Sequence, residues 1–134
     1  MTMQYSLTHR TNAMSQLNTD LAASAVIKIF SGTIPANCGT ADSGTLLVTF
    51  AGNAGGFGAA ASQVLTASAV ANATAAATGT AGYFRIYPSA ATTTNAVVQG
   101  TCGMSAADMI LTNTSITSGQ TVSFTNLTVT AFGI

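Results

Sequence analysis

Few residues of this sequence could act as metal ligands, nucleophiles, or general acids and bases. They are one histidine, two cysteines and three aspartates: His9, Cys38, Cys102, Asp20, Asp42 and Asp108. A metal site needs several such ligands close together, and neither a CxxC nor an HxxxH spacing brings them together in the sequence. We therefore expect no metal site and no cofactor.

Catalytic constellations are equally hard to assemble from these residues. A serine or cysteine nucleophile needs a base beside it, but the single imidazole, His9, lies next to Arg10 near the start of a predicted helix. Glycoside hydrolysis needs two paired carboxylates, and the three aspartates fall in a predicted helix, a loop and a strand edge. No GxxxxGK[ST] phosphate-binding loop is present. The sequence predicts that the protein is not an enzyme, and a small enzyme ranks third among the functions considered.

Charged side chains make up 4% of the 134 residues, and the formal net charge is zero. An ordinary soluble domain is about 25% charged, and charge keeps copies of a protein apart in solution. We therefore expect this protein to work packed against neighbours and to form a homo-oligomer, most simply a dimer or trimer. Its three basic residues are scattered, whereas nucleic-acid binders cluster theirs, so no nucleic-acid partner is expected.

The sequence also predicts where the protein is made. Residues 1–21 lack the charged start and apolar run of a signal peptide, and there is no apolar run of about 18 residues. We expect synthesis in the cytoplasm and no membrane partner. In a reducing cytosol Cys38 and Cys102 are expected as free thiols, although their glycine- and threonine-rich loops leave a disulfide open.

Residues 1–23 are predicted to form an N-terminal helical arm. Apolar side chains recur at helical spacing over Thr8–Ala23, and Ser6 or Thr8 can cap the helix start. This helix could lie across a sheet or pack against a neighbouring subunit. The apolar stripe, a candidate contact surface, consists of Leu7, Met14, Leu17 and Leu21.

Residues 24–134 are predicted to form an all-β domain, because their apolar pattern has a period of two. Threonine favours strands, while glycine and asparagine favour turns. About eight short strands joined by such turns are typical of a β-sandwich or jelly roll. The predicted strands are Ala25–Phe30, Thr45–Phe50, Gln63–Ala67, a weak one at Ala69–Thr78, Thr80–Tyr87, Asn95–Gly100, Asp108–Thr112 and Gln120–Phe132.

The alternation slips by one residue in the last predicted strand. Val122 and Phe124 share one face, and Leu127 and Val129 share the next. A β-bulge near Thr125–Asn126 would keep both pairs inward. The residues expected to be mostly buried are Ile27, Ile29, Leu47, Phe84, Ile86, Val97, Ile110, Val122, Phe124, Leu127 and Val129.

Two predicted strands resemble each other, since each carries one basic residue, Lys28 or Arg85, within an apolar segment. Two interpretations are open. The cations could face outward and meet Asp42 or Asp108 of a neighbouring subunit. Alternatively, and this is the interpretation we favour, they are isolated charges that keep a sheet face exposed to solvent and discourage incorrect pairing of strand edges.

Aromatic residues on the same strands are further candidates for contact. Tyr83 and Tyr87 share a strand face, and Phe30 lies nearby if the two resembling strands pair. Such a face could bind carbohydrate, but the chain has no tryptophan, and tyrosine and phenylalanine are also enriched at subunit interfaces. We therefore expect an interface. Its candidate residues, besides the helix stripe, are Lys28, Phe30, Tyr83, Arg85 and Tyr87.

Three segments carry a resemblance to a known family. They are Ile27–Phe50 (IKIFSGTIPANCGTADSGTLLVTF), Gly79–Tyr87 (GTAGYFRIY) and Gly100–Thr130 (GTCGMSAADMILTNTSITSGQTVSFTNLTVT), after a short helix. From residue 5 to the end, this order resembles small structural proteins encoded in tailed-bacteriophage genomes. The resemblance implies a virion component and carries over no catalytic residue. Members of the family carry more acidic residues than this chain, and its low charge favours packing in a lattice.

The leading functional expectation combines this resemblance with the low charge. It is a non-enzymatic capsid cement or decoration protein of a phage head, which binds the major capsid protein and copies of itself on the outer surface of the virion. The alternative is a tail- or fibre-associated module that contacts host surface glycans.

Overall fold

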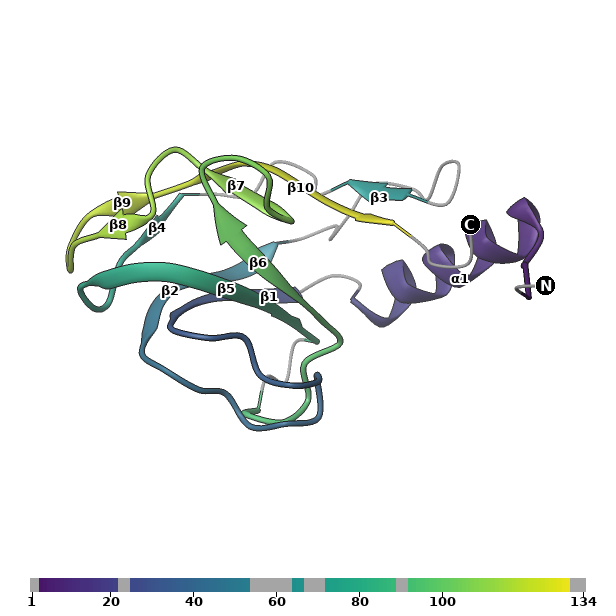
Figure 1. Ribbon diagram of the computed structural model, residues 1–134, viewed down its shortest axis with the longest axis horizontal. Helices are drawn as coiled ribbons and strands as arrows, with labels where there is room; N and C mark the ends of the chain where they lie inside the picture. Colours follow the sequence, from purple (N-terminus) through teal and green to yellow (C-terminus); the bar gives the residue numbers. More distant parts are fainter. Residues whose placement is uncertain (1–2, 22–24, 54–63, 67–71, 89–91, 131–134) are drawn as a thin grey trace.

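The protein is mainly β, with one helix (Figure 1). The computed structural model describes residues 3–21, 25–53, 64–66, 72–88 and 92–130. The helix α1 spans Leu7–Asp20, and Ser6 caps it by accepting the His9 N–H at 3.1 Å. The described strands are β1 (Ala25–Ser31), β2 (Leu46–Asn53), β3 (Val64–Thr66), β4 (Ala73–Thr74), β5 (Gly79–Tyr87), β6 (Val98–Gly103), β7 (Met109–Leu111), β8 (Ser115–Ile116), β9 (Thr121–Val122) and β10 (Phe124–Thr130).

One large sheet dominates the fold. Its strand order is β2-β1-β5-β6-β7-β10-β3, and β8 pairs with the start of β5. All of these pairings are antiparallel except the short parallel one between β6 and β7. A second, small sheet contains β4 and β9.

The period-two pattern of β1 and β5 builds the centre of this sheet. Ile27 pairs with Ile86 and Ile29 pairs with Phe84, and all four side chains are buried on the same face. This matches the predicted burial of these residues. β-branched and aromatic side chains in such cross-strand pairs stabilise a sheet by packing against each other.

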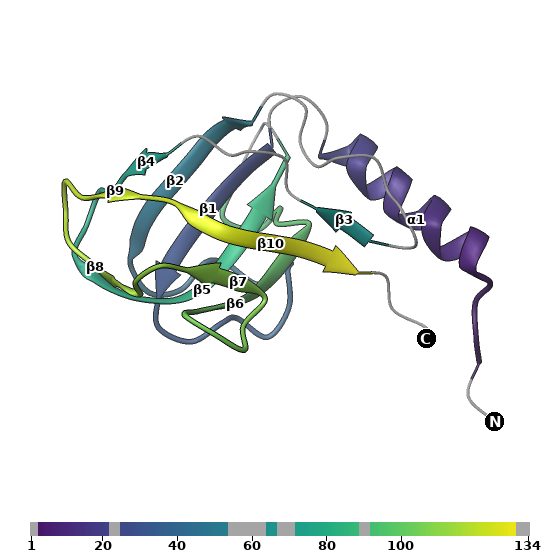
Figure 2. The same cartoon turned by 90° about the horizontal axis from the view of Figure 1, so that it is seen from above.

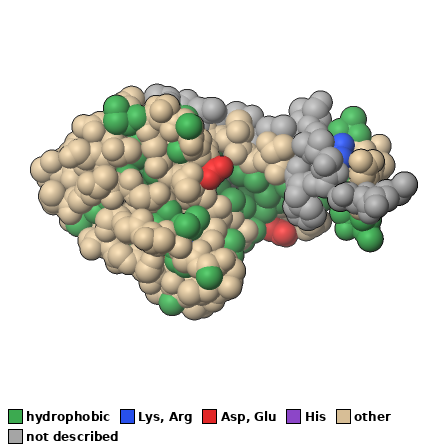
Figure 3. Space-filling view, in the orientation of Figure 1, with side chains coloured by type: hydrophobic (Ala, Val, Ile, Leu, Met, Phe, Trp, Pro, Cys, Tyr) green, Lys and Arg blue, Asp and Glu red, His purple; other side chains and the backbone are tan. Residues whose placement is uncertain are grey.

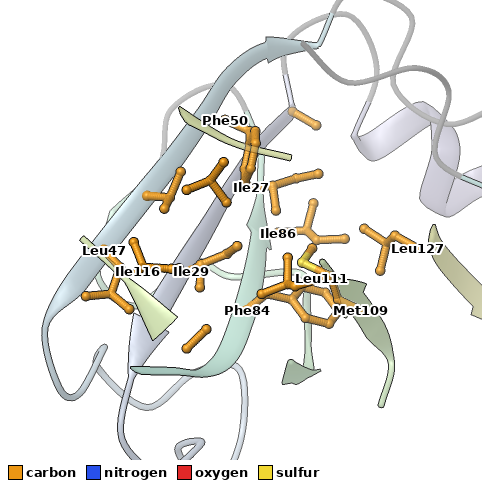
Figure 4. Close-up of a cluster of buried hydrophobic side chains, with 14 of the residues drawn as sticks. Ile27, Ile29, Leu47, Phe50, Phe84, Ile86, Met109, Leu111, Ile116 and Leu127 are labelled. Atoms are coloured by element: carbon orange, nitrogen blue, oxygen red, sulfur yellow. The ribbon is translucent and has the colours of Figure 1, made fainter. Parts of the chain in front are cut away.

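The large sheet curls, so that its later strands lie opposite its first ones across one core (Figures 2 and 4). The rings of Phe50 on β2 and Phe124 on β10 meet edge to face, with their centroids 5.4 Å apart. Besides the four residues at the sheet centre, the core cluster includes Leu47, Val48, Phe50, Met109, Leu111, Ile116, Val122 and Leu127.

The predicted β-bulge in the last strand is confirmed. The register between β10 and β7 shifts between Phe124, which is opposite Leu111, and Asn126, which is opposite Ile110. The shift keeps the apolar side chains inward on both sides of it, since Leu127 is buried and Phe124 is half-buried against the core.

The helix packs its C-terminal half onto the same core. Leu21, the C-cap residue, is 0% exposed, Met14 is buried, and Leu17 packs partly against the cluster. Leu7, at the other end of the stripe, is 53% exposed. The stripe is therefore largely used inside this chain, and the N-terminal end of α1 extends away from the sheet (Figure 2).

Some of the predicted details are wrong. Val97 is 37% exposed rather than buried, because the next residue, Val98, pairs with Ile86 and packs against the core, and successive residues of a strand face opposite sides. Ile110 and Val129 are only half-buried. The strand predicted at Asn95–Gly100 runs instead from Val98 to Gly103.

The weak strand predicted at Ala69–Thr78 is reduced to the two residues of β4, and residues 69–71 lie outside the described residues. The predicted strand Gln63–Ala67 is described only over the three residues of β3. In the described part of the chain, α1 is neither long nor apolar enough to cross a membrane.

Candidate functional site

The most distinctive polar feature of the structure is the buried side chain of Arg85. It projects from β5, opposite Lys28 on β1, and is 0% exposed. The prediction that Arg85 faces outward into solvent is wrong. The loop 32–45, which connects β1 to β2, covers this face of the sheet and bonds to the guanidinium.

The Arg85 guanidinium is surrounded by acceptors. Nη1 donates to the Thr40 carbonyl at 2.7 Å and to Asp42 Oδ1 at 2.8 Å. Nη2 donates to the Asn37 carbonyl at 3.0 Å and to Gln99 Oε1 at 2.9 Å, and Nε donates to the same Gln99 oxygen at 3.1 Å. A buried charge is tolerated only when it is paired and fully hydrogen-bonded, and this one satisfies that condition. We call these residues and Tyr87 the Arg85 cluster.

The Asp42 carboxylate joins the loop to the end of β5 as well. The same Oδ1 accepts a hydrogen bond from the Tyr87 hydroxyl, and the Asp42 N–H donates to the Thr93 carbonyl at 3.1 Å. Burial raises the pKa of Tyr87 above its usual value, and the hydrogen bond to Asp42 and its negative charge raise it further. Lys28 Nζ lies 4.9 Å from the centroid of the Tyr87 ring, in cation–π contact.

A second anchor holds the far end of the loop. The Tyr83 hydroxyl donates to the Ser43 carbonyl at 2.6 Å and accepts the Ser43 N–H at 3.0 Å. The Tyr83 ring stacks on Phe30 with centroids 5.1 Å apart. Gln99 adds a third anchor, because its Nε2 donates to the Pro35 carbonyl at 2.9 Å. The loop is therefore fixed to two strands of the sheet, β5 and β6.

The predicted contact residues of the two resembling strands thus do come together on one face. Their surroundings, however, differ from the prediction. Phe30, Tyr83 and Tyr87 are buried, as Arg85 is, and Lys28 is half-exposed. The aspartate that meets Arg85 is Asp42 of the same chain. A buried polar cluster of this kind orders a loop, and its carboxylate is already occupied by Arg85 and Tyr87.

The other titratable residues lie apart from the Arg85 cluster. Asp108 Oδ2 accepts the N–H and the hydroxyl of Thr101, both at 2.9 Å. Cys102 Sγ lies 3.9 Å from Met109 Sδ. Burial, followed by the negative charge of Asp108, raises the pKa of the Cys102 thiol to about 12. Cys38 and Cys102 are both free thiols, as expected.

The helix carries the remaining candidates. His9 is exposed and stacks on Tyr5 with ring centroids 5.3 Å apart. Asp20 accepts a hydrogen bond from Gln16 at 3.0 Å. Within the described ranges, no three histidine, cysteine or aspartate side chains are close enough together to hold a metal ion.

A surface hollow of about 260 Å³ lies where β6 and β10 diverge. Sequence reasoning did not find this hollow, because it arises from the shortness of β7 between two longer strands. Its lining consists of Phe84, Val98, Gln99, Asp108, Thr128, Val129 and Thr130.

Comparisons with protein-family models, with curated proteins and with solved structures give no match for this chain.

Proposed function

We propose that this chain is a non-enzymatic structural protein of a tailed-phage virion. In this proposal it binds the outer surface of the head, contacts the major capsid protein and copies of itself, and stabilises the shell. The observation that carries the proposal is where the few charges lie. Arg85 and Asp42 form an ion pair that is buried inside the protein. The surface is therefore composed mostly of uncharged polar and small apolar groups, as the face in Figure 3 shows.

The ordered loop 32–45 supports this proposal. Its exposed residues include Thr33, Asn37, Thr40 and Ala41, which are small and uncharged. The Arg85 cluster and Tyr83 hold the loop in one arrangement, so little conformational entropy is lost when the loop meets a partner. Contacts of this kind depend on shape, apolar area and hydrogen bonds, and salt screens them far less than it screens ion pairs.

The proposal also includes the finer architecture. We interpret the two opposed halves of the curled large sheet, together with the small β4–β9 sheet, as the two layers of a β-sandwich of the jelly-roll type. The edge-to-face contact of Phe50 with Phe124 across the core supports two layers. Double-sheet jelly rolls of about eight strands are the fold of many viral capsid domains.

The test compares virions that contain this protein with virions from a phage in which its gene is deleted. We expect the deleted particles to lose their DNA at a lower temperature, and purified protein added back to them to restore heat resistance. Raising the salt concentration should leave the attachment of the added protein nearly unchanged. A matched variant, Asp20→Asn, should restore heat resistance as well as the wild type, because Asp20 is exposed on the helix.

Two results would overturn the proposal. If the deleted particles are as heat-resistant as the wild type but attach poorly to host cells, the protein is a tail or fibre module that contacts a host glycan. If the purified protein does not bind deleted particles at all, it is not a capsid component.

A further inference from the structure

The hollow between β6 and β10 is a break in the large sheet. The two strands flank β7, but β7 pairs only with Cys102 and Gly103 of β6 and reaches only to Leu127 of β10. Among the described residues, none pairs with residues 98–100 of β6 on the side away from β5. In the same described part of the chain, none pairs with residues 128–130 of β10 on the side away from β3. Two strand edges therefore face the hollow.

An aspartate substitutes for a strand at one end of this break. The N–H of Thr101, next to the open edge of β6, donates to the Asp108 carboxylate instead of to a neighbouring strand. Gly100 makes this close approach possible, since a Cβ there would lie 2.7 Å from the Phe84 ring and 2.9 Å from the Asp108 Cβ. Beyond Asp108, open strand edges are templates for pairing with another chain.

The hollow has the features that an extended segment requires. Strand edges supply backbone hydrogen bonds along both sides, and apolar Phe84, Val98 and Val129 line it. An exposed carboxylate, Asp108, stands at its rim. A matching segment is about three or four residues long, because strands rise about 3.3 Å per residue, and it carries apolar side chains at alternate positions and no negative charge.

The segment before α1 has these properties. Ser6 is extended, with φ −63° and ψ 155°, and the helix begins only at Leu7. Met3 is 78% exposed and Tyr5 is 42% exposed, at alternate positions. Residues 1–19 include no aspartate or glutamate, so this segment brings no carboxylate close to Asp108. We call residues 3–6 the N-terminal segment.

The position of the helix selects a second copy as the donor. α1 is anchored at its C-terminal end by Leu21 and is about 21 Å long, at 1.5 Å per residue over its 14 residues. Its other end, with the N-terminal segment, points away from the sheet (Figure 2). The segment is thus presented outward, where it can reach the hollow of another molecule.

We propose that the N-terminal segment of one copy adds as a strand between β6 and β10 of a second copy, in line with β7. Met3 and Tyr5 then cover the apolar lining, and the backbone pairs with both open edges, which is a known mode of peptide recognition. This self-association goes beyond the proposed virion role and does not depend on it.

The first test is disulfide trapping between copies, in a Cys38→Ser background. Cys102 can remain, because its thiol pKa of about 12 keeps it protonated near neutral pH. Chains carrying Met3→Cys are mixed with chains carrying Thr128→Cys. Linked heterodimers should form about tenfold faster than with Thr121→Cys, an exposed control on β9, because docking raises the effective concentration of the two thiols.

Equal rates with Thr128→Cys and Thr121→Cys would overturn the proposal. A chain that carries both Met3→Cys and Thr128→Cys provides a second check. If it closes its disulfide within one molecule at high dilution, the donor is the same chain and the proposed exchange is wrong.

The second test measures self-association of full chains by sedimentation. Met3→Asp should raise the dissociation constant for self-association by about tenfold or more, since it places a second carboxylate beside Asp108 and removes an apolar contact. Gln4→Asp adds the same charge on the opposite face of the segment and should have a much smaller effect. Equal effects of the two variants, or a wild-type chain that stays monomeric at high concentration, would contradict the proposal.

Discussion

The guanidinium of Arg85 lies 2.8 Å from the carboxylate of Asp42, although the two residues are 43 positions apart in the chain. Their side chains are 0% and 12% exposed, so both charged groups are largely desolvated. The contact joins the centre of strand β5 to the loop 32–45. It makes the loop part of the folded structure, because neither charge can be removed without leaving the other in a poor environment.

Asp42→Ala should therefore destabilise the fold strongly. We expect the free energy of unfolding to fall by about 3–5 kcal/mol, the usual cost of an uncompensated buried charge. Chemical denaturation measures this change. Asp20→Ala removes an exposed aspartate from the helix and should change stability by no more than about 0.5 kcal/mol. Similar effects of the two variants would mean that the Arg85 cluster contributes little.

Gly82→Ala should be more harmful than a glycine substitution within the loop. A Cβ at Gly82 would lie 2.1 Å from the Gly32 carbonyl oxygen, so either the loop start or β5 must move. Overpacking of this kind costs about 1–3 kcal/mol or more. At Gly39 the nearest atom to an added Cβ is Asn37 Oδ1 at 3.4 Å, so Gly39→Ala should be mild. Thermal unfolding of the two variants gives the comparison.

The two ends of the helix stripe should respond differently to truncation. Leu21 is fully buried in the core of its own chain, and Leu21→Ala should cost about 2–5 kcal/mol. Leu7 is exposed, and Leu7→Ala should change the free energy of unfolding by about 0.5 kcal/mol or less. A charged substitution at Leu21 would therefore unfold the protein, and it cannot serve as a test of assembly. A cost at Leu7 equal to that at Leu21 would show that both ends are buried in solution.

High pH should destabilise the protein through Cys102. Its pKa rises from 9.0 to about 12 on folding. Above pH 9 the unfolded thiol loses its proton while the folded thiol keeps it, so the unfolded state binds fewer protons and stability falls as the pH rises from 9 to 12. The loss is at most about 1.4 kcal/mol per pH unit.

The control for this prediction is the second thiol of the chain. Cys102→Ala should flatten the fall in stability between pH 9 and 12, measured by denaturant titration at each pH, whereas Cys38→Ala should leave it unchanged. Tyr87 contributes a loss of the same sign at still higher pH, since its pKa is also raised. If the stability of the two cysteine variants depends on pH in the same way, burial does not raise the pKa of Cys102 as described.

Periodicity was sufficient to predict the central strands and part of the core. Ile27, Ile29, Phe84 and Ile86 alternate with less apolar residues, and alternation fixes which side chains share a face. The slip between Phe124 and Leu127 predicted the bulge for the same reason. The small residues of Ala69–Thr78 give no comparable signal, and the extent of β4 could not be predicted from them.

The environment of Arg85 could not be predicted in the same way. Alternation placed Lys28, Arg85 and the tyrosines on one face, but it does not show what covers that face. The loop that does so has no periodic pattern, and its decisive residue, Asp42, appears as an ordinary polar loop residue in the sequence. A lone arginine inside an apolar strand is the signal that favours a search for a distant aspartate.

The position of β10 has a consequence for how the protein is made. β10 lies between β7 and β3 in the large sheet, so a strand near the end of the chain joins one that was synthesised more than sixty residues earlier. Until β10 has left the ribosome, the core over β1, β2 and β5 lacks the side chains of Phe124 and Leu127. Folding of this chain is therefore completed only after residue 130 has been synthesised. The partly synthesised chain, whose apolar surface is still incompletely covered, is the form most prone to aggregation.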